Sequence, residues 1–233
     1  MSPVQILLQQ SADARTQFQT LPFIQEVLTE GGSLAAYLDF LGQAYHHVKH
    51  TVPLLALAAA RCGPRDSSYR SALFKYIAEE QGHEAWILED IDALGGNARQ
   101  VEHDSPRFAC KIMVGHAYYL IDHVSPYGLL GMVHVLEGMS VALASQAARA
   151  IRESLRISGD GGFKYLTTHG ELDIGHTSFF AELIDDIGPE HLPLVISSAR
   201  DFYRLYGALF EDINTHRRST SAAPIEFIHG LTQ

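Results

Sequence analysis

The sequence has little cysteine and little positive charge, and each shortage excludes a class of protein. The two cysteines, Cys62 and Cys110, form no Cys-x-x-Cys motif, so no disulfide framework is predicted and reduced thiols suit the cytoplasm. The chain has 17 Lys and Arg against 27 Asp and Glu, a formal net charge of -10 at pH 7. Nucleic-acid binding needs a basic patch, and anionic membranes attract polybasic segments, so neither partner is expected.

Long hydrophobic runs and strand-like alternation are also missing. No stretch approaches the ~18 consecutive apolar residues of a membrane span. The first residues lack the basic start and the apolar run of about 7–15 residues that mark a signal peptide, so we expect a cytoplasmic protein. Apolar residues instead recur with helical spacing, and no period-two run is bounded by turn residues. The sequence therefore predicts an all-α protein.

Glycine, proline and serine residues interrupt the helical pattern and predict where the helices end. We expect one domain over residues 1–233, a bundle of about seven helices with a loose arm at 1–20 and a tail at 217–233. Pro53 lies inside a predicted helix and should kink it. The predicted helices cover approximately residues 22–31, 33–62, 66–95, 105–124, 125–156, 163–187 and 189–214.

One carboxylate falls on the apolar face of the predicted helix at 66–95. At about 100° per residue, Glu80 lies in the middle of that face, His83 and Glu84 flank it, and Glu79 points elsewhere. An unpaired buried charge costs several kcal/mol, so Glu80 should be neutralised, paired or bound to a metal. The spacing Glu80-x-x-His83 lets two side chains converge on one ion, as in helical di-iron carboxylate proteins.

Two later predicted helices also place ionisable side chains on an apolar face. Glu137 is embedded in the apolar sequence of the helix at 125–156. The helix at 163–187 contains His169-x-x-x-Asp173-x-x-His176, and positions i, i+4 and i+7 share one helix face. Two imidazoles and a carboxylate at this spacing suit Fe, Mn or Zn.

The helix at 33–62 supplies a further candidate. His47 flanks its apolar face, whereas His46 and His50 point away from it. His47 is therefore the favoured ligand and His46 the alternative. Seven ligands are too many for one tetrahedral zinc and suit two octahedral iron ions. The candidate ligands are His47, Glu80, His83, Glu137, His169, Asp173 and His176.

Taken together, these motifs resemble those of the heme-oxygenase-like di-iron oxidases, which share a fold with heme oxygenase, thiaminase II and pyrroloquinoline-quinone synthase. The resemblance covers about residues 20–214 and rests on the order of the four ligand-bearing segments. It departs at the first long helix, at 33–62, where familiar members usually have a glutamate and the matching region of this chain offers the histidines His46 and His47. Thiaminase II-like members have a nucleophilic cysteine on the helix that carries Glu137 here, and this helix has none.

The resemblance implies a heme-oxygenase-like bundle that binds two Fe(II) ions and uses dioxygen as co-substrate. The implied substrate is a small amino- or carboxylate-bearing metabolite, such as an amino acid or a fatty acid, and a homodimer is one expected assembly. Glu84 is the candidate for a carboxylate that orients ligands or shuttles protons. Two alternatives stay open: a non-catalytic helical protein that binds a metal or a small molecule, and a cofactorless oxidase on the same fold.

Overall fold

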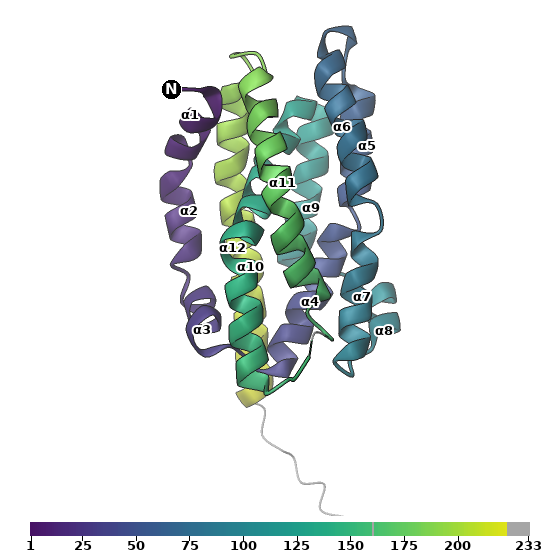
Figure 1. Cartoon of the computed structure of the whole chain (residues 1–233), viewed down its shortest axis with the longest axis vertical. Helices are drawn as coiled ribbons and strands as arrows, with labels where there is room; N and C mark the ends of the chain where they lie inside the picture. Colours follow the sequence, from purple (N-terminus) through teal and green to yellow (C-terminus); the bar gives the residue numbers. More distant parts are fainter. Residues whose placement is uncertain (160, 223–233) are drawn as a thin grey trace, which may run out of the picture.

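The computed structural model describes residues 1–159 and 161–222, and the side chains among them outside 169–175 and 220–222. The described residues form helices and no strand, which confirms the all-α prediction. Figure 1 shows α1–α3 on one side of α10 and α12, and α5–α8 on the other. The α-helices are α1 (Pro3–Gln10), α2 (Ala12–Gln19), α3 (Pro22–Glu30), α4 (Leu34–Val48), α5 (Thr51–Arg61), α6 (Ser67–Glu80), α7 (His83–Ala93), α8 (Ala98–His103), α9 (Phe108–Tyr119), α10 (Leu129–Leu155), α11 (Lys164–Asp186) and α12 (Leu192–Ala222).

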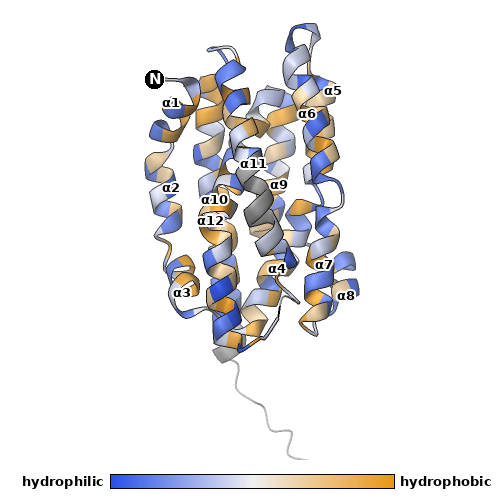
Figure 2. Ribbon diagram, in the orientation of Figure 1, coloured by the Kyte–Doolittle hydropathy of each residue, from blue (hydrophilic) through white to orange (hydrophobic). Residues whose placement is uncertain are grey.

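Helix α10 lies at the centre of the packing and contacts α11, α12, α3 and α5. Its approach to α12 depends on Gly131, where an added Cβ would lie 2.4 Å from Ser198 Oγ and 2.5 Å from Ala199 N. In Figure 2 the outer helices carry both hydrophilic and hydrophobic residues along their length, as expected when only one face is buried.

By length and composition, α10 and the turn before it (Pro126–Leu155) could cross a membrane, since an 18-residue window has a mean hydropathy of 1.4. This qualifies the expectation that no segment approaches a membrane span. The helix nevertheless contacts α11, α12, α3 and α5, and its buried residues include Leu130, Val135 and Met139. Burial inside the bundle therefore accounts for part of its apolar character, since 44% of that window is buried.

The helix predicted at 33–62 is divided at Lys49 and His50 into α4 and α5. Ser33 caps α4, because its Oγ accepts a hydrogen bond from Ala36 N at 3.2 Å. Pro53 has no N–H for the carbonyl of Lys49, and its ring would clash with that carbonyl in a continuous helix. The chain therefore breaks one turn before the proline, where we had expected only a kink.

The helix predicted at 66–95 is also two helices, and this break was not predicted. Gln81 is extended, and Gly82 has φ of +93°, in the left-handed region that favours glycine. Glu80 ends α6 and His83 begins α7. The two predicted ligands therefore lie on different helices.

Residues 1–20 and 217–222 are more helical than predicted. The expected loose arm at 1–20 forms α1 and α2, because Leu7 and Phe18 are buried in the core. Helix α12 continues through residues 217–222 of the expected tail, and residues 223–233 lie outside the described part of the chain.

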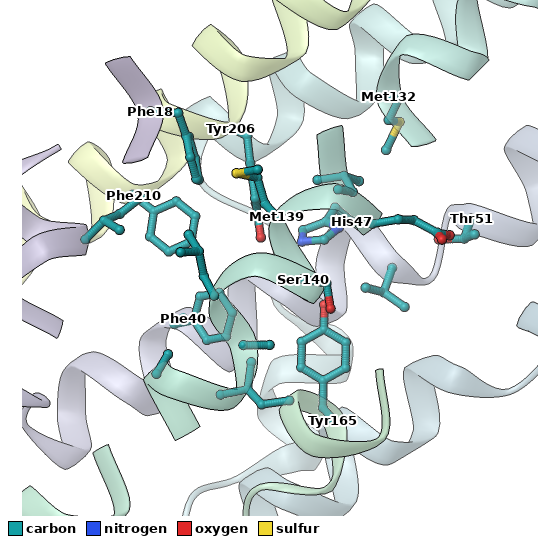
Figure 3. A pocket seen from close by; sticks show the side chains of 18 of the residues that line it. Phe18, Phe40, His47, Thr51, Met132, Met139, Ser140, Tyr165, Tyr206 and Phe210 are labelled. Atoms are coloured by element: carbon teal, nitrogen blue, oxygen red, sulfur yellow. The ribbon is translucent and has the colours of Figure 1, made fainter. Parts of the chain in front are cut away.

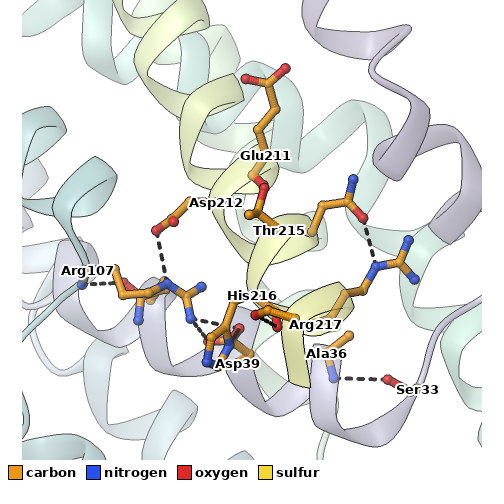
Figure 4. A network of polar contacts seen from close by, with 12 residues as sticks. Ser33, Ala36, Asp39, Arg107, Glu211, Asp212, Thr215, His216 and Arg217 are labelled. Carbon is orange, nitrogen blue, oxygen red and sulfur yellow. Dashed lines mark hydrogen bonds and ion pairs between the residues drawn. The ribbon is translucent and has the colours of Figure 1, made fainter. Parts of the chain in front are cut away.

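A polar network ties α12 to the start of α4 and α9 (Figure 4). Arg107 Nη1 donates to Asp39 Oδ1 at 2.6 Å, and its Nε donates to Asp212 Oδ2 at 3.0 Å. His216 Nδ1 lies 3.1 Å from Asp39 Oδ2. These contacts fix the end of the bundle at which α4 and α9 begin and α12 ends.

Candidate metal centre

Three helices bring a carboxylate, a second carboxylate and an imidazole to one point. Glu80 ends α6, Glu137 lies in α10 and His176 lies in α11. One ligand atom from each lies within 4.8 Å of the others. His176 Nδ1 is 3.3 Å from Glu80 Oε1 and 3.6 Å from Glu137 Oε2. The sequence named all three as ligands, and the structure places them side by side.

The cluster has the charge and spacing that a buried cation requires. The side chains of Glu80, Glu137 and His176 are only 4%, 13% and 9% exposed. The ion-pair partners seen for these carboxylates are imidazoles: His83 and His176 for Glu80, and His176 for Glu137. Two ligand atoms held at right angles about 2.1 Å from one ion are about 3 Å apart. Two carboxylates and an imidazole therefore fit one iron ion without large rearrangement.

His83 contacts the same site from the other side of Glu80. Its Nδ1 lies 3.1 Å from Glu80 Oε2, and its ring stacks on Trp86 with centroids 4.1 Å apart. The aromatic contact fixes the ring plane, and the nitrogen fixes the second oxygen of Glu80. In this geometry His83 orients Glu80, and its own binding to a metal stays a prediction.

A cavity of about 180 Å³ adjoins Glu80 and Glu137, and His47 is among the residues that line it. Figure 3 shows His47, Tyr206 and Ser140 around this space. The other polar side chains in its wall are those of Tyr37, Thr51, Tyr76 and Tyr165. The remaining lining is apolar and includes Phe18, Phe23, Phe40, Leu54, Met132, Leu136, Ala144, Ile151 and Phe210.

The other two histidines of the helix predicted at 33–62, His46 and His50, do not line the cavity. His46 Nδ1 lies 3.3 Å from Lys49 Nζ, and burial together with that ammonium lowers the pKa of His46 to about 4. His50 Nδ1 lies 3.0 Å from the hydroxyl of Tyr118. The preference for His47 over His46 thus agrees with the geometry, and its role as a ligand remains a prediction.

Glu84 is not brought to the cluster. It is half-buried on α7, does not line the cavity, and belongs to none of the described groups that could hold an ion. The charge of Glu84 instead affects Tyr45 on α4. Burial raises the pKa of Tyr45, and the charges of Glu102 and Glu84 raise it further. The break at Gly82 explains why the prediction for Glu84 differs from the structure. The angle of about 100° per residue relates two side chains only within one continuous helix, and Glu80 and Glu84 lie on different helices.

Two predicted ligands, His169 and Asp173, have side chains outside the described residues. Their backbone belongs to α11, the same continuous helix as His176. Glu79, by contrast, was not predicted and contacts the cluster: its Oε2 lies 3.4 Å from His176 Nε2. Glu79 precedes Glu80 at the end of α6, and the position next to a buried carboxylate was the available signal.

Comparison with known proteins agrees with this geometry. A family model described as an iron-containing redox enzyme matches residues 38–207, which include Glu80, Glu137 and His176. The chain belongs to this family. Membership in the iron-containing redox enzyme family supports an oxidoreductase whose chemistry depends on iron. No curated protein sequence matches the chain.

Solved structures show the same fold at low sequence identity. A domain from Shewanella denitrificans with a heme oxygenase-like fold has a TM-score of 0.85 at 20% identity, covering 97% of each chain. A TenA homologue from Pseudomonas syringae has a TM-score of 0.77 at 12% identity, covering 91% of this chain and 93% of its own. Heme oxygenase-2 from Synechocystis, solved with heme and NO, has a TM-score of 0.75 at 14% identity, covering 94% and 88%. The predicted heme oxygenase-like bundle is confirmed.

Proposed function

We propose that this member of the iron-containing redox enzyme family is a non-heme iron oxidase that uses dioxygen to oxidise a small organic molecule. The observation that carries the proposal is the buried group of Glu80, Glu137 and His176. His47, His83, His169 and Asp173 complete the proposed ligand set, which has enough donors for two Fe(II) ions. Bound iron would supply the redox chemistry with dioxygen.

The chain itself supplies charge, orientation and a largely apolar cavity. Glu80 and Glu137 balance the charge of the cation in a region that excludes water. His83 holds one oxygen of Glu80, and this leaves the other oxygen directed to His176 and Glu137. The adjoining cavity is where a substrate would be held out of bulk water.

The lining of the cavity narrows the class of substrate. No lysine or arginine is among its described lining residues, so no side-chain cation would hold a carboxylate there. An amino or carboxylate group would therefore be placed at the Glu80 and Glu137 end, beside the metal. The rest of the molecule would lie against phenylalanine, leucine and methionine side chains. We infer a small acid or amine with an apolar body, a description that fits a fatty acid or an apolar amino acid.

Anaerobic titration with Fe(II), followed by metal analysis and exposure to dioxygen, tests the proposal. We expect close to two iron per chain and rapid oxygen uptake. Glu137→Gln should weaken binding by more than about 100-fold, because losing only a hydrogen-bond partner of a ligand costs about 10–100-fold. Glu153→Gln, on the same helix outside the cluster, is the control. One iron per chain would still support iron-dependent oxidation, but only some of the seven predicted residues would then be ligands. Failure of the wild-type protein to bind iron would overturn the proposal.

The same experiment separates the alternatives. A cofactorless oxidase would keep its activity after chelation, and a binding protein would hold a ligand without consuming oxygen. A heme protein would show a strong visible band on titration with hemin, a band that Fe(II) alone does not give. We also propose that the protein acts in the cytoplasm, and gel filtration of the purified chain tests the expected homodimer.

A further inference from the structure

The imidazole of His176 has carboxylates on both of its nitrogen sides. Its Nδ1 faces Glu80 and Glu137, and its Nε2 lies 3.4 Å from Glu79 Oε2. Glu79 and Glu80 are consecutive residues of α6, so their side chains leave the helix about 100° apart. They therefore reach the His176 ring from two different directions.

Glu79 belongs to a set of contacts that join α6 to α11 around this ring. Lys75, one turn earlier, has its Nζ 3.9 Å from Glu79 Oε1 and 4.4 Å from the ring centroid of Phe179. Tyr76 meets His176 edge to face, with centroids 5.0 Å apart. Phe179 follows His176 by one turn of α11. Glu79 is thus held on the side of His176 that faces away from the two buried carboxylates.

A neutral imidazole has one N–H and one lone pair, and its environment decides which nitrogen has which. Histidines that bind metals usually donate the other ring N–H to a carboxylate or a carbonyl, and this contact fixes both the tautomer and the ring plane. Here the carboxylate beside Nε2 is Glu79, and the nitrogen left for the metal is Nδ1.

We propose that Glu79 is a positioning residue, which accepts the Nε2 proton of His176 and directs Nδ1 at an ion held by Glu80 and Glu137. This inference rests on the proposed function, because it assumes that the cluster binds a metal. The competing interpretation is that Glu79 is only the surface partner of Lys75, with a side chain that is 37% exposed.

Zinc affinity of the full-length protein distinguishes the two, because Zn(II) accepts the same ligands without redox chemistry. The site is identified as the zinc binding that Glu137→Ala removes. We expect Glu79→Ala to weaken that binding by about 10–100-fold. Glu79→Gln should restore most of it, since an amide oxygen still accepts the proton. Glu89→Ala removes the same charge from α7, where Glu89 pairs with Lys164 at 2.7 Å, and should leave the affinity unchanged.

Long-range proton–nitrogen NMR of the zinc-loaded protein gives a second measurement. We expect His176 to bind zinc through Nδ1 and to hold its proton on Nε2, with the Nε2–H signal weakened in Glu79→Ala by exchange with water. Equal zinc affinities for Glu79→Ala and Glu89→Ala, or a proton on Nδ1, would overturn the proposed role of Glu79 but not the metal site. If the wild-type protein does not bind zinc at this cluster, the inference is overturned together with the metal site on which it rests.

Discussion

Glu80 and Glu137 could be predicted from sequence to be buried carboxylates, because each is a charged residue on a helix face that is otherwise apolar. A buried carboxylate is costly unless a cation or a hydrogen-bond donor stabilises it, so its position is informative without any knowledge of the fold. Glu79 escaped the same reasoning because its side chain leaves the helix toward solvent and only its tip reaches His176. Helical periodicity gives the direction of a side chain at Cβ, and it does not give the position of a flexible terminal group.

A residue elsewhere in the core makes stability depend on pH. His134 is buried near Phe180, its Nε2 is 3.4 Å from Ser11 Oγ, and burial together with the charge of Arg15 lowers its pKa to about 4. Unfolding returns this pKa to about 6.5, so the unfolded chain binds more protons between these values. The free energy of unfolding should therefore fall as pH decreases from about 6.5 to 4, with a contribution from His134 of up to about 3 kcal/mol.

Urea unfolding of the metal-free protein at several pH values measures this contribution. His134→Gln, which does not titrate, should lose less stability over this range than the wild-type protein. The exposed His103→Gln serves as the control. Parallel pH profiles for wild type and His134→Gln would contradict the assignment.

At the scale of the helix, the ends of helices were predicted correctly where two glycine or proline residues occur together. They were predicted poorly where a single glycine was the only signal. Gly63-Pro64 and the glycine-rich segment before Phe163 lie where helices were predicted to end and do end. Gly82 is a single glycine, which a helix tolerates at about 1 kcal/mol, so the pattern around it still favoured a continuous helix. The break between α6 and α7 depends on tertiary packing and on a left-handed φ, which local periodicity does not report.

Gly82→Ala tests how much that break matters. An added Cβ at Gly82 meets nothing within 4 Å, so the cost comes from the left-handed φ alone. We expect a loss of about 1–2 kcal/mol in the free energy of unfolding and weaker metal binding through displacement of His83 from Glu80. Gly115→Ala is the matched control, with equal space but within α9. It should be neutral or stabilising by about 0.5–1 kcal/mol. Equal unfolding energies for the two variants would rule out strain at Gly82.

For the whole molecule, the fold class and the meeting of three helices at one site followed from sequence, whereas the cavity did not. A cavity forms from side chains of many helices, and its size depends on packing details that a one-dimensional pattern does not contain. The same holds for His47, which sequence placed only at the flank of an apolar face and which the assembled bundle places at the cavity.

Filling the cavity should separate substrate binding from metal binding. Ser140 lies in the cavity wall (Figure 3), and Ser140→Leu places a larger apolar side chain in that space. We expect iron stoichiometry and thermal stability to be kept and the affinity for an apolar probe such as decanoate to fall at least tenfold. Thr215→Leu, on an exposed part of α12, is the control. Calorimetric titration that gives the same decanoate affinity for all three proteins would show that the cavity is not the binding site.

The three residues of the cluster lie on α6, α10 and α11, so they are far apart along the chain and meet only after long-range packing. A ribosome must release most of the sequence before this site can form. Metal loading would then follow folding and, by mass action, would favour the native state over the unfolded chain. The lifetime of the protein in a cell would therefore depend on the supply of its metal.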